Sequence, residues 1–142
     1  MDHPETPALK PSVKRVAPRV YSARNERDAE LTIGFGPGEF SPGDLLKLAL
    51  LGCHVLSSDA RFAHALGDDY ALTGTVDASF SKEDDRFTDF TVELFPELGD
   101  MSPEDREQLM HRVAGAVRHF CTITHTLTPG APTHMVVDGD PM

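Results

Sequence analysis

Two cysteines, Cys53 and Cys121, lie 68 positions apart in this chain of 142 residues. In a reducing compartment such residues more often have a chemical role, or fill space in the core, than form a structural disulfide. The chemical role would be redox: one thiolate attacks an oxidant and becomes a sulfenic acid, with which the second thiol condenses to a disulfide. On the residues alone, inert burial stays an open alternative.

Cys53 lies in the run Phe40–Leu56, which has the features of a buried helix. Ser41 can cap the first turn, Pro42 fits the first helical position, and Asp44 completes a capping box. The rest of the run is apolar on almost every side, so we expect protein to enclose the helix. It is too short and interrupted to cross a bilayer, which takes about 20 apolar residues.

A thiolate at Cys53 would need help from elsewhere in the chain. Its apolar neighbours would raise its pKa, and it lies about three turns from the helix start, too far for a strong dipole effect. A guanidinium stays charged when it is buried, so arginine is the best source of positive charge. Arg24 and Arg27, in a polar turn, are the candidates. The alternative for both is an ordinary solvated turn arginine.

The segments before the helix predict a hairpin. Val13–Tyr21 has scattered valines interrupted by Pro18 and is typical of an edge strand. A polar turn follows over residues 22–28, and Ala29–Ile33 alternates apolar and polar residues, the period of a half-buried strand.

The segments after the helix predict a second hairpin and a second helix. Leu72–Phe80 and Phe90–Leu94 alternate in polarity, Ser102 precedes an amphipathic helix, and Cys121 falls at its end. A short strand over Thr133–Val137 follows. We therefore predict an α+β fold, a mostly antiparallel sheet with two main helices on one face.

Length and charge bound the possible functions. The chain is long enough for a single domain, residues 1–142, and we expect loose tails at 1–11 and 138–142. Thirteen basic and 23 acidic residues give a formal charge of −10, which argues against nucleic acid or an anionic membrane as a partner. The N-terminus has no secretory signal pattern, so we expect a cytoplasmic protein. Because one small sheet cannot surround an apolar helix, we expect a homodimer.

Other chemistries have weaker support. A metal site would use the cysteines and nearby histidines, but the sequence contains no Cys-x-x-Cys and adjacent helical residues point about 100° apart. No serine occupies a strand-to-helix elbow, and the glycine-rich residues 34–38 lack the lysine and spacing of a phosphate loop. The metal candidates are Cys53, His54, His119, Cys121 and His125.

The chain resembles the OsmC/Ohr family of thiol-dependent hydroperoxide reductases over roughly Val13 to Val137. The resemblance rests on two motifs and two supporting segments. These are Phe40-Ser41-Pro42-Gly43-Asp44-Leu45-Leu46 leading to Leu51-Gly52-Cys53, Phe120-Cys121-Thr122-Ile123-Thr124-His125-Thr126-Leu127, the hairpin Tyr21–Arg27, and Leu66-Gly67-Asp68-Asp69-Tyr70.

The resemblance implies an intertwined homodimer whose sheets wrap two central helices, with active sites at the interface. Cys53 would be the peroxidatic and Cys121 the resolving cysteine, and Arg24, or Arg27 in second place, would stabilise the thiolate. Organic hydroperoxides, and less well hydrogen peroxide, would be the substrates. No cofactor is expected, and a dithiol such as lipoamide or another thiol would reduce the disulfide.

One position departs from the family pattern. Members usually carry a glutamate after the helix-opening proline that holds the arginine, and here that position is Gly43. Glu26 or Glu39 could hold the arginine instead, whereas Asp44 is turned about 100° away and occupied by capping. The alternative function is a non-catalytic member of the fold that binds a small apolar ligand and has buried or redox-sensing cysteines.

Overall fold

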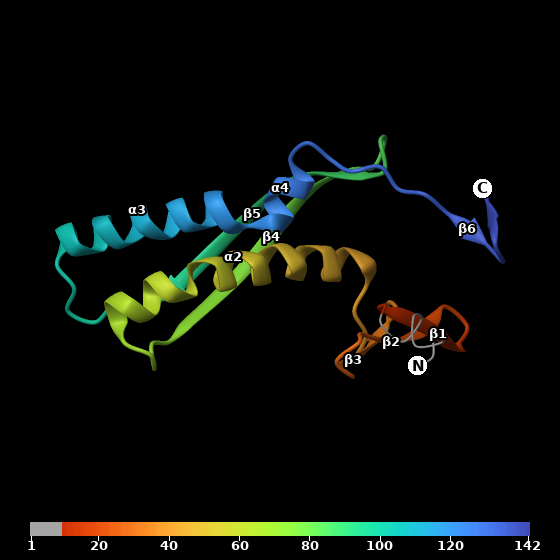
Figure 1. Ribbon diagram of the computed structural model, residues 1–142, viewed down its shortest axis with the longest axis horizontal. Helices are drawn as coiled ribbons and strands as arrows, with labels where there is room; N and C mark the ends of the chain where they lie inside the picture. Colours follow the sequence, from red (N-terminus) through yellow and green to blue (C-terminus); the bar gives the residue numbers. More distant parts are fainter. Residues whose placement is uncertain (1–9) are drawn as a thin grey trace, which may run out of the picture. The chain divides into compact units, whose positions relative to one another are not determined.

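The structure is a computed structural model that describes residues 10–142 (Figure 1). It comprises two compact units, the first ending at Leu48 and the second running from Ala49 to Met142. Most of the tail predicted over residues 1–11 lies outside the described residues. No described helix is long and apolar enough to cross a membrane.

The first unit contains a three-stranded antiparallel sheet of β1 (Ser12–Ala17), β2 (Val20–Arg24) and β3 (Glu30–Ile33). The prediction of one edge strand over Val13–Tyr21 was wrong. The chain reverses at Pro18-Arg19, where Arg19 has a positive φ of 60°, and Ala17 pairs with Val20. Proline at this point starts a turn because its fixed φ suits the first central position.

The turn between β2 and β3 is held by Asn25. Its side-chain oxygen accepts hydrogen bonds from the backbone N–H groups of Arg27 and Ala29, at 2.9 and 3.0 Å. Asp28 closes the turn with a φ of 65°, a conformation that aspartate tolerates better than most residues. The turn fixes the register that places Arg24 directly opposite Glu30.

Helix α2 (Pro42–Leu66) begins with the predicted capping box. Ser41 Oγ accepts from the N–H of Asp44 at 3.0 Å, and the Asp44 carboxylate accepts from the N–H of Ser41 at 2.9 Å. These bonds lower the pKa of Asp44. The helix continues unbroken through Ser58, whose hydroxyl donates to the His54 carbonyl oxygen, and it ends before Gly67, which has a φ of 99°.

The second unit contains the other elements. The hairpin of β4 (Leu72–Ser81) and β5 (Arg86–Pro96) is antiparallel and longer than predicted in its second strand. Helix α3 (Pro103–Phe120) is capped by Ser102, whose hydroxyl oxygen accepts from the Asp105 N–H at 3.1 Å. A short helix not predicted from the sequence, α4 (Thr122–Leu127), follows directly.

The core of this unit lies between α2, α3 and the β4–β5 hairpin. Phe62, Leu109 and Val113 are buried at its centre. By contrast, Leu56 on the same helix as Phe62 is 79% exposed. The single chain therefore does not enclose α2 on all sides, and its enclosure in a homodimer stays a prediction. The residues packed around the centre are Leu66, Tyr70, Leu72, Leu94, Leu98, Met101 and Met110.

The chain ends in a small hairpin of β6 (Val136–Val137) and β7 (Asp140–Pro141). The strand expected over residues 133–137 is thus shorter, and a partner strand follows it. The Met142 N–H donates to the Met135 carbonyl oxygen at 3.0 Å. The α+β class is confirmed, but the described strands form three separate antiparallel sheets.

Candidate active site

Cys53 lies in the middle of α2, in the second unit, and its side chain is half-buried. The residues around it come from two elements. Ser57 is one turn further along α2, while Cys121, Thr122 and Ile123 lie at the junction of α3 and α4. The α3–α4 junction therefore meets the middle of α2 at the thiol.

Hydrogen bonds make Cys53 easier to ionise. Burial raises the pKa of this thiol, but it is outweighed by the backbone N–H of Ile123, the side chains of Cys121 and Ser57, and the backbone N–H of Thr122. Each group donates to the sulfur, and hydrogen bonding to the charged form lowers a pKa. The pKa of Cys53 is thus below its ordinary value. The sequence analysis expected an arginine to lower the pKa of Cys53. In the structure the groups that lower it are uncharged hydrogen-bond donors, all from the second unit.

Cys121 joins the two helices, with none of its surface exposed. Its backbone N–H donates to the Val117 carbonyl oxygen and closes α3, and its sulfur accepts from the Thr124 N–H at 3.5 Å as the cap of α4. Thr124 Oγ1 also donates to this sulfur, at 3.1 Å. The second thiol is therefore held by the start of α4.

His54 lies beside the same sulfur. Its Nδ1 atom is 3.6 Å from Cys121 Sγ and 3.0 Å from the Leu50 carbonyl oxygen. The histidines at the end of α3 and in α4 have other contacts: His119 packs edge-on against Phe120, and His125 Nε2 donates to the Arg118 carbonyl oxygen at 2.8 Å. Within residues 10–142, no three His, Cys, Asp or Glu side chains are arranged to hold a metal ion.

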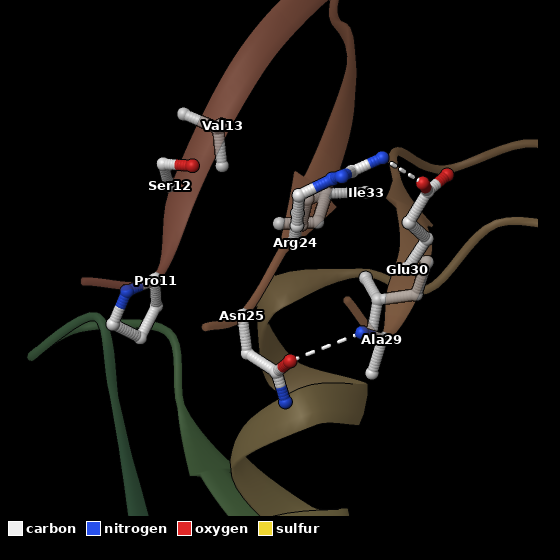
Figure 2. Close-up of a pocket in the computed structure, with 10 residues that line it drawn as sticks. Pro11, Ser12, Val13, Arg24, Asn25, Ala29, Glu30 and Ile33 are labelled. Carbon is white, nitrogen blue, oxygen red and sulfur yellow. Dashed lines mark hydrogen bonds and ion pairs between the residues drawn. The ribbon is translucent and has the colours of Figure 1, made fainter. Parts of the chain in front are cut away.

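The first unit contains the predicted arginines and a pocket of about 400 Å³. Arg24 lies at the end of β2 and contributes to the pocket wall, together with Glu30 (Figure 2). Arg27 lies in the turn and pairs with Glu26 at 3.7 Å. The pocket is also lined by Val13, Ala23, Ala29, Leu31 and Ile33, which make it largely apolar.

The acidic partners of Arg24 are Glu30 and Asp28, which sequence reasoning missed. The guanidinium pairs with the Glu30 carboxylate and lies 3.3 Å from Asp28 Oδ1. Of the two predicted holders, Glu26 pairs with Arg27 and Glu39 accepts from the Gly36 N–H at 2.9 Å. Asp44 caps α2, as expected. The pairing of Arg24 with Glu30 could have been predicted from the sequence. A hairpin that turns at Asn25 places Glu30 directly opposite Arg24.

The donors at the two sulfurs were also missed, namely Ser57, Thr122, Ile123 and Thr124, together with His54 as a contact of Cys121. The available signal was Cys121-Thr122-Ile123-Thr124 directly after a predicted helix. A small polar side chain at such a point can cap a second helix. Once α4 is recognised, its first N–H groups have to point at the nearest acceptors.

Comparison with curated proteins finds mycobacterial relatives. The uncharacterized proteins Rv2923c of Mycobacterium tuberculosis and Mb2948c of Mycobacterium bovis are each 33% identical to this chain over 129 residues. The match covers 88% of this chain and 93% of each relative. No protein-family model matches the chain.

Solved structures share the fold. An osmotic-stress and detoxification response protein of Psychrobacter arcticus, described as putative in its own name, has 16% identity and a TM-score of 0.65 over 84% of this chain and 88% of its own. The OsmC-like protein VCA0330 of Vibrio cholerae has 14% identity and a TM-score of 0.61, with 78% and 79% covered. The organic hydroperoxide resistance protein OhrB of Bacillus subtilis has 15% identity and a TM-score of 0.52, with 84% and 91% covered.

Proposed function

Since this chain belongs to one family with the mycobacterial proteins and has the OsmC/Ohr fold, we propose that it is a thiol-dependent peroxidase that reduces organic hydroperoxides. The observation that carries the proposal is the half-buried Cys53 thiol, whose pKa is lowered by donors that include the second cysteine. A nucleophilic sulfur needs both a thiolate and access for its substrate.

In the first step the Cys53 thiolate attacks the terminal oxygen of the hydroperoxide. The S–O bond forms, the O–O bond breaks, and the alkoxide leaves and takes up a proton. Sulfur supplies the two electrons and becomes a sulfenic acid. Hydrogen peroxide follows the same route with hydroxide as the leaving group, but it has no apolar tail to bind.

In the second step Cys121 attacks the Cys53 sulfenic acid. The Cys53–Cys121 disulfide forms, and the hydroxyl group leaves as water with the proton of the Cys121 thiol. Cys121 is already a hydrogen-bond partner of Cys53, so the attack requires little movement. An external dithiol such as lipoamide, or another thiol, then restores both thiols by exchange.

Arg24 is the arginine that we propose for the peroxide. It lines a pocket whose other walls are largely apolar, a combination that suits an alkyl tail next to a polar head (Figure 2). Its paired carboxylate, Glu30, fixes the direction of the guanidinium, the role that Gly43 cannot fill. A fixed positive charge would stabilise the oxygen that leaves.

The functional form is proposed to be a homodimer. Leu56 on α2 is exposed in the single chain, and an exposed leucine on a helix rich in apolar residues favours a partner surface. Light scattering should give twice the mass of the chain, and Leu56→Glu should shift the population toward monomer. A stable monomer at micromolar concentration would remove the dimer from the proposal.

Mass spectrometry after one equivalent of cumene hydroperoxide tests the function. We expect a loss of two hydrogens per chain that maps to a Cys53–Cys121 link. Cys53→Ser should abolish peroxide consumption, whereas Cys121→Ser should consume one equivalent and accumulate sulfenic acid. Undiminished multiple turnover by Cys53→Ser would refute the peroxidase.

The second candidate is a non-catalytic binder of a small apolar ligand, favoured by the pocket in the first unit. Alkylation by iodoacetamide across pH separates the two candidates. A Cys53 that reacts like a free thiol, with a pKa near about 8.5 or above, would favour the binder. A thiol that stays reactive at lower pH favours the enzyme.

A further inference from the structure

His54 has a fixed hydrogen on the ring nitrogen that faces Cys121. Its Nδ1 atom is 3.0 Å from the Leu50 carbonyl oxygen, one turn earlier in α2. A carbonyl oxygen only accepts hydrogen bonds, so Nδ1 must carry the hydrogen whichever charge the ring has. The same nitrogen lies 3.6 Å from Cys121 Sγ, so its one hydrogen is shared between the Leu50 carbonyl oxygen, at the shorter distance, and the sulfur.

Three donor groups therefore converge on one buried sulfur. The N–H of His54 approaches from α2, and the backbone N–H and hydroxyl of Thr124 approach from α4. These groups all donate to the sulfur, so the hydrogen of the Cys121 thiol is left for another acceptor. Cys53, which has the Cys121 side chain as a hydrogen-bond partner, is such an acceptor.

We propose, on the basis of the peroxidase proposed above, that His54 is a catalytic hydrogen-bond donor to Cys121. It orients the S–H of Cys121 toward Cys53 and stabilises the negative charge on the Cys121 sulfur when its proton leaves. As the S–S bond forms, the S–O bond of the Cys53 sulfenic acid breaks. The departing hydroxyl takes the Cys121 proton as water, so atoms and electrons balance.

The same donors act when the disulfide is reduced. An external thiolate attacks the more exposed sulfur, Cys53, and Cys121 leaves as a thiolate. A leaving sulfur whose charge is stabilised leaves faster. His54 thus assists Cys121 both as the attacking and as the leaving sulfur.

Two variants of His54 separate a donor from a space-filling residue. Asparagine places an amide N–H at the position of Nδ1, whereas leucine fills similar space without a donor. After one equivalent of cumene hydroperoxide, a sulfenic-acid trap such as dimedone follows Cys53. We expect disulfide formation in His54→Leu to be slower by about 10- to 100-fold, as for a lost hydrogen bond to a charged atom, with sulfenic acid accumulating. His54→Asn should recover most of the rate.

A second arm uses diamide, which needs no peroxidase activity. A Cys53 thiolate adds to diamide, and Cys121 then attacks Cys53 Sγ and releases the hydrazine. At diamide concentrations that make the addition fast, the second phase reports attack by Cys121 alone. We expect the same order of rates: wild type, then His54→Asn, then His54→Leu. Circular dichroism of both variants shows whether α2 is intact.

The two arms distinguish the two proposals. If peroxide leaves Cys53 unchanged while the diamide phase depends on His54, the peroxidase fails and the role of His54 stands. If peroxide oxidises Cys53 but folded His54→Leu closes the disulfide at the wild-type rate in both arms, His54 has no such role. Equal slowing in His54→Asn and His54→Leu would also overturn it, because shape rather than donation would then matter.

Discussion

The guanidinium of Arg24 is ion-paired with the carboxylate of Glu30, its direct partner across strands β2 and β3. Both side chains are 54% exposed. Exposed ion pairs contribute little to stability, about 0–1 kcal/mol. We therefore expect the ion pair to matter for the orientation of the guanidinium at the pocket, and to contribute little to the free energy of folding.

Arg24→Met should separate activity from stability. If Arg24 stabilises the leaving oxygen, the kcat/KM for cumene hydroperoxide falls by about 100-fold, the typical cost of one lost electrostatic donor. The free energy of unfolding should change by less than about 1 kcal/mol. Arg27→Met is the matched control, since Arg27 lies three residues further along, in the turn after β2, and its nearest carboxylate oxygen, on Glu26, is 3.7 Å away. Equal losses in the two variants would contradict the assignment to Arg24.

The lowered pKa of Cys53 makes stability depend on pH. A group whose pKa is depressed in the folded state contributes stability that is fully present above its unfolded pKa, about 8.5 for a thiol. This contribution is lost as pH falls through the folded value. Relative to Cys53→Ala, the wild-type protein should therefore gain stability with rising pH up to about 8.5. Urea unfolding at several pH values measures it, and a constant difference would contradict the lowered pKa.

Ser57 offers a way to shift that pKa. Ser57→Ala removes one donor to the sulfur, so the pKa of Cys53 should rise. The measurement is the pH dependence of iodoacetamide alkylation in a Cys121→Ser background, which keeps a hydroxyl donor and leaves one thiol to label. An alkylation profile unmoved by Ser57→Ala would show that this hydroxyl does not donate to Cys53.

Much of the fold was predictable because local signals agreed with it. Ser41 and Asp44 form the expected capping box, Ser102 begins α3, and the alternation from Leu72 onward produces β4. Boundaries were less predictable where one residue permits two outcomes. Proline is compatible with an edge strand as well as with a turn. Pro18 lies in a turn because β1 pairs with β2.

The two cysteines could be chosen from the sequence, but their surroundings could not. The donors to Cys53 include the backbone N–H groups of Thr122 and Ile123. These groups are directed at the sulfur only once α4 has formed. A six-residue helix leaves a weak periodic signal in the sequence. Composition predicts a buried helix around Cys53, yet burial depends on what covers each face, and the single chain covers one side of α2.

Tyr70 provides a spectroscopic test of the core beside α2. Its ring stacks on Phe62 and its hydroxyl donates to Asp59; burial, followed by this bond and the nearby charge, raises its pKa to about 12. A raised folded pKa contributes stability below the unfolded value of about 10, and this stability is lost as pH rises through about 12.

The chain has two tyrosines, so Tyr21→Phe leaves Tyr70 as the single phenol. Absorbance at 295 nm should then show no titration near pH 10 while near-ultraviolet circular dichroism remains native. Asp59→Asn should lower the pKa, because it removes the negative charge that opposes ionisation. A native protein that titrates near pH 10 would contradict the described contact.

Gly74 sets how closely β4 approaches α2. A Cβ atom placed there would lie 3.1 Å from Leu51 Cδ1, 3.1 Å from Leu94 Cδ2 and 3.3 Å from the Glu93 carbonyl oxygen. The leucines can shift a little but the backbone oxygen cannot, so Gly74→Ala should destabilise the protein by about 1–3 kcal/mol, as overpacking does. Because Leu51 lies two residues before Cys53, we also expect slower disulfide formation.

Gly115→Ala is the matched control for this substitution. Gly115 lies in α3, and a Cβ atom there would meet nothing within 4 Å. Alanine is favoured over glycine in a helix by about 1 kcal/mol, so this variant should be more stable than the wild type. Chemical denaturation of both variants measures the difference. If Gly74→Ala proves as stable as Gly115→Ala, β4 does not approach α2 as closely as Gly74 indicates.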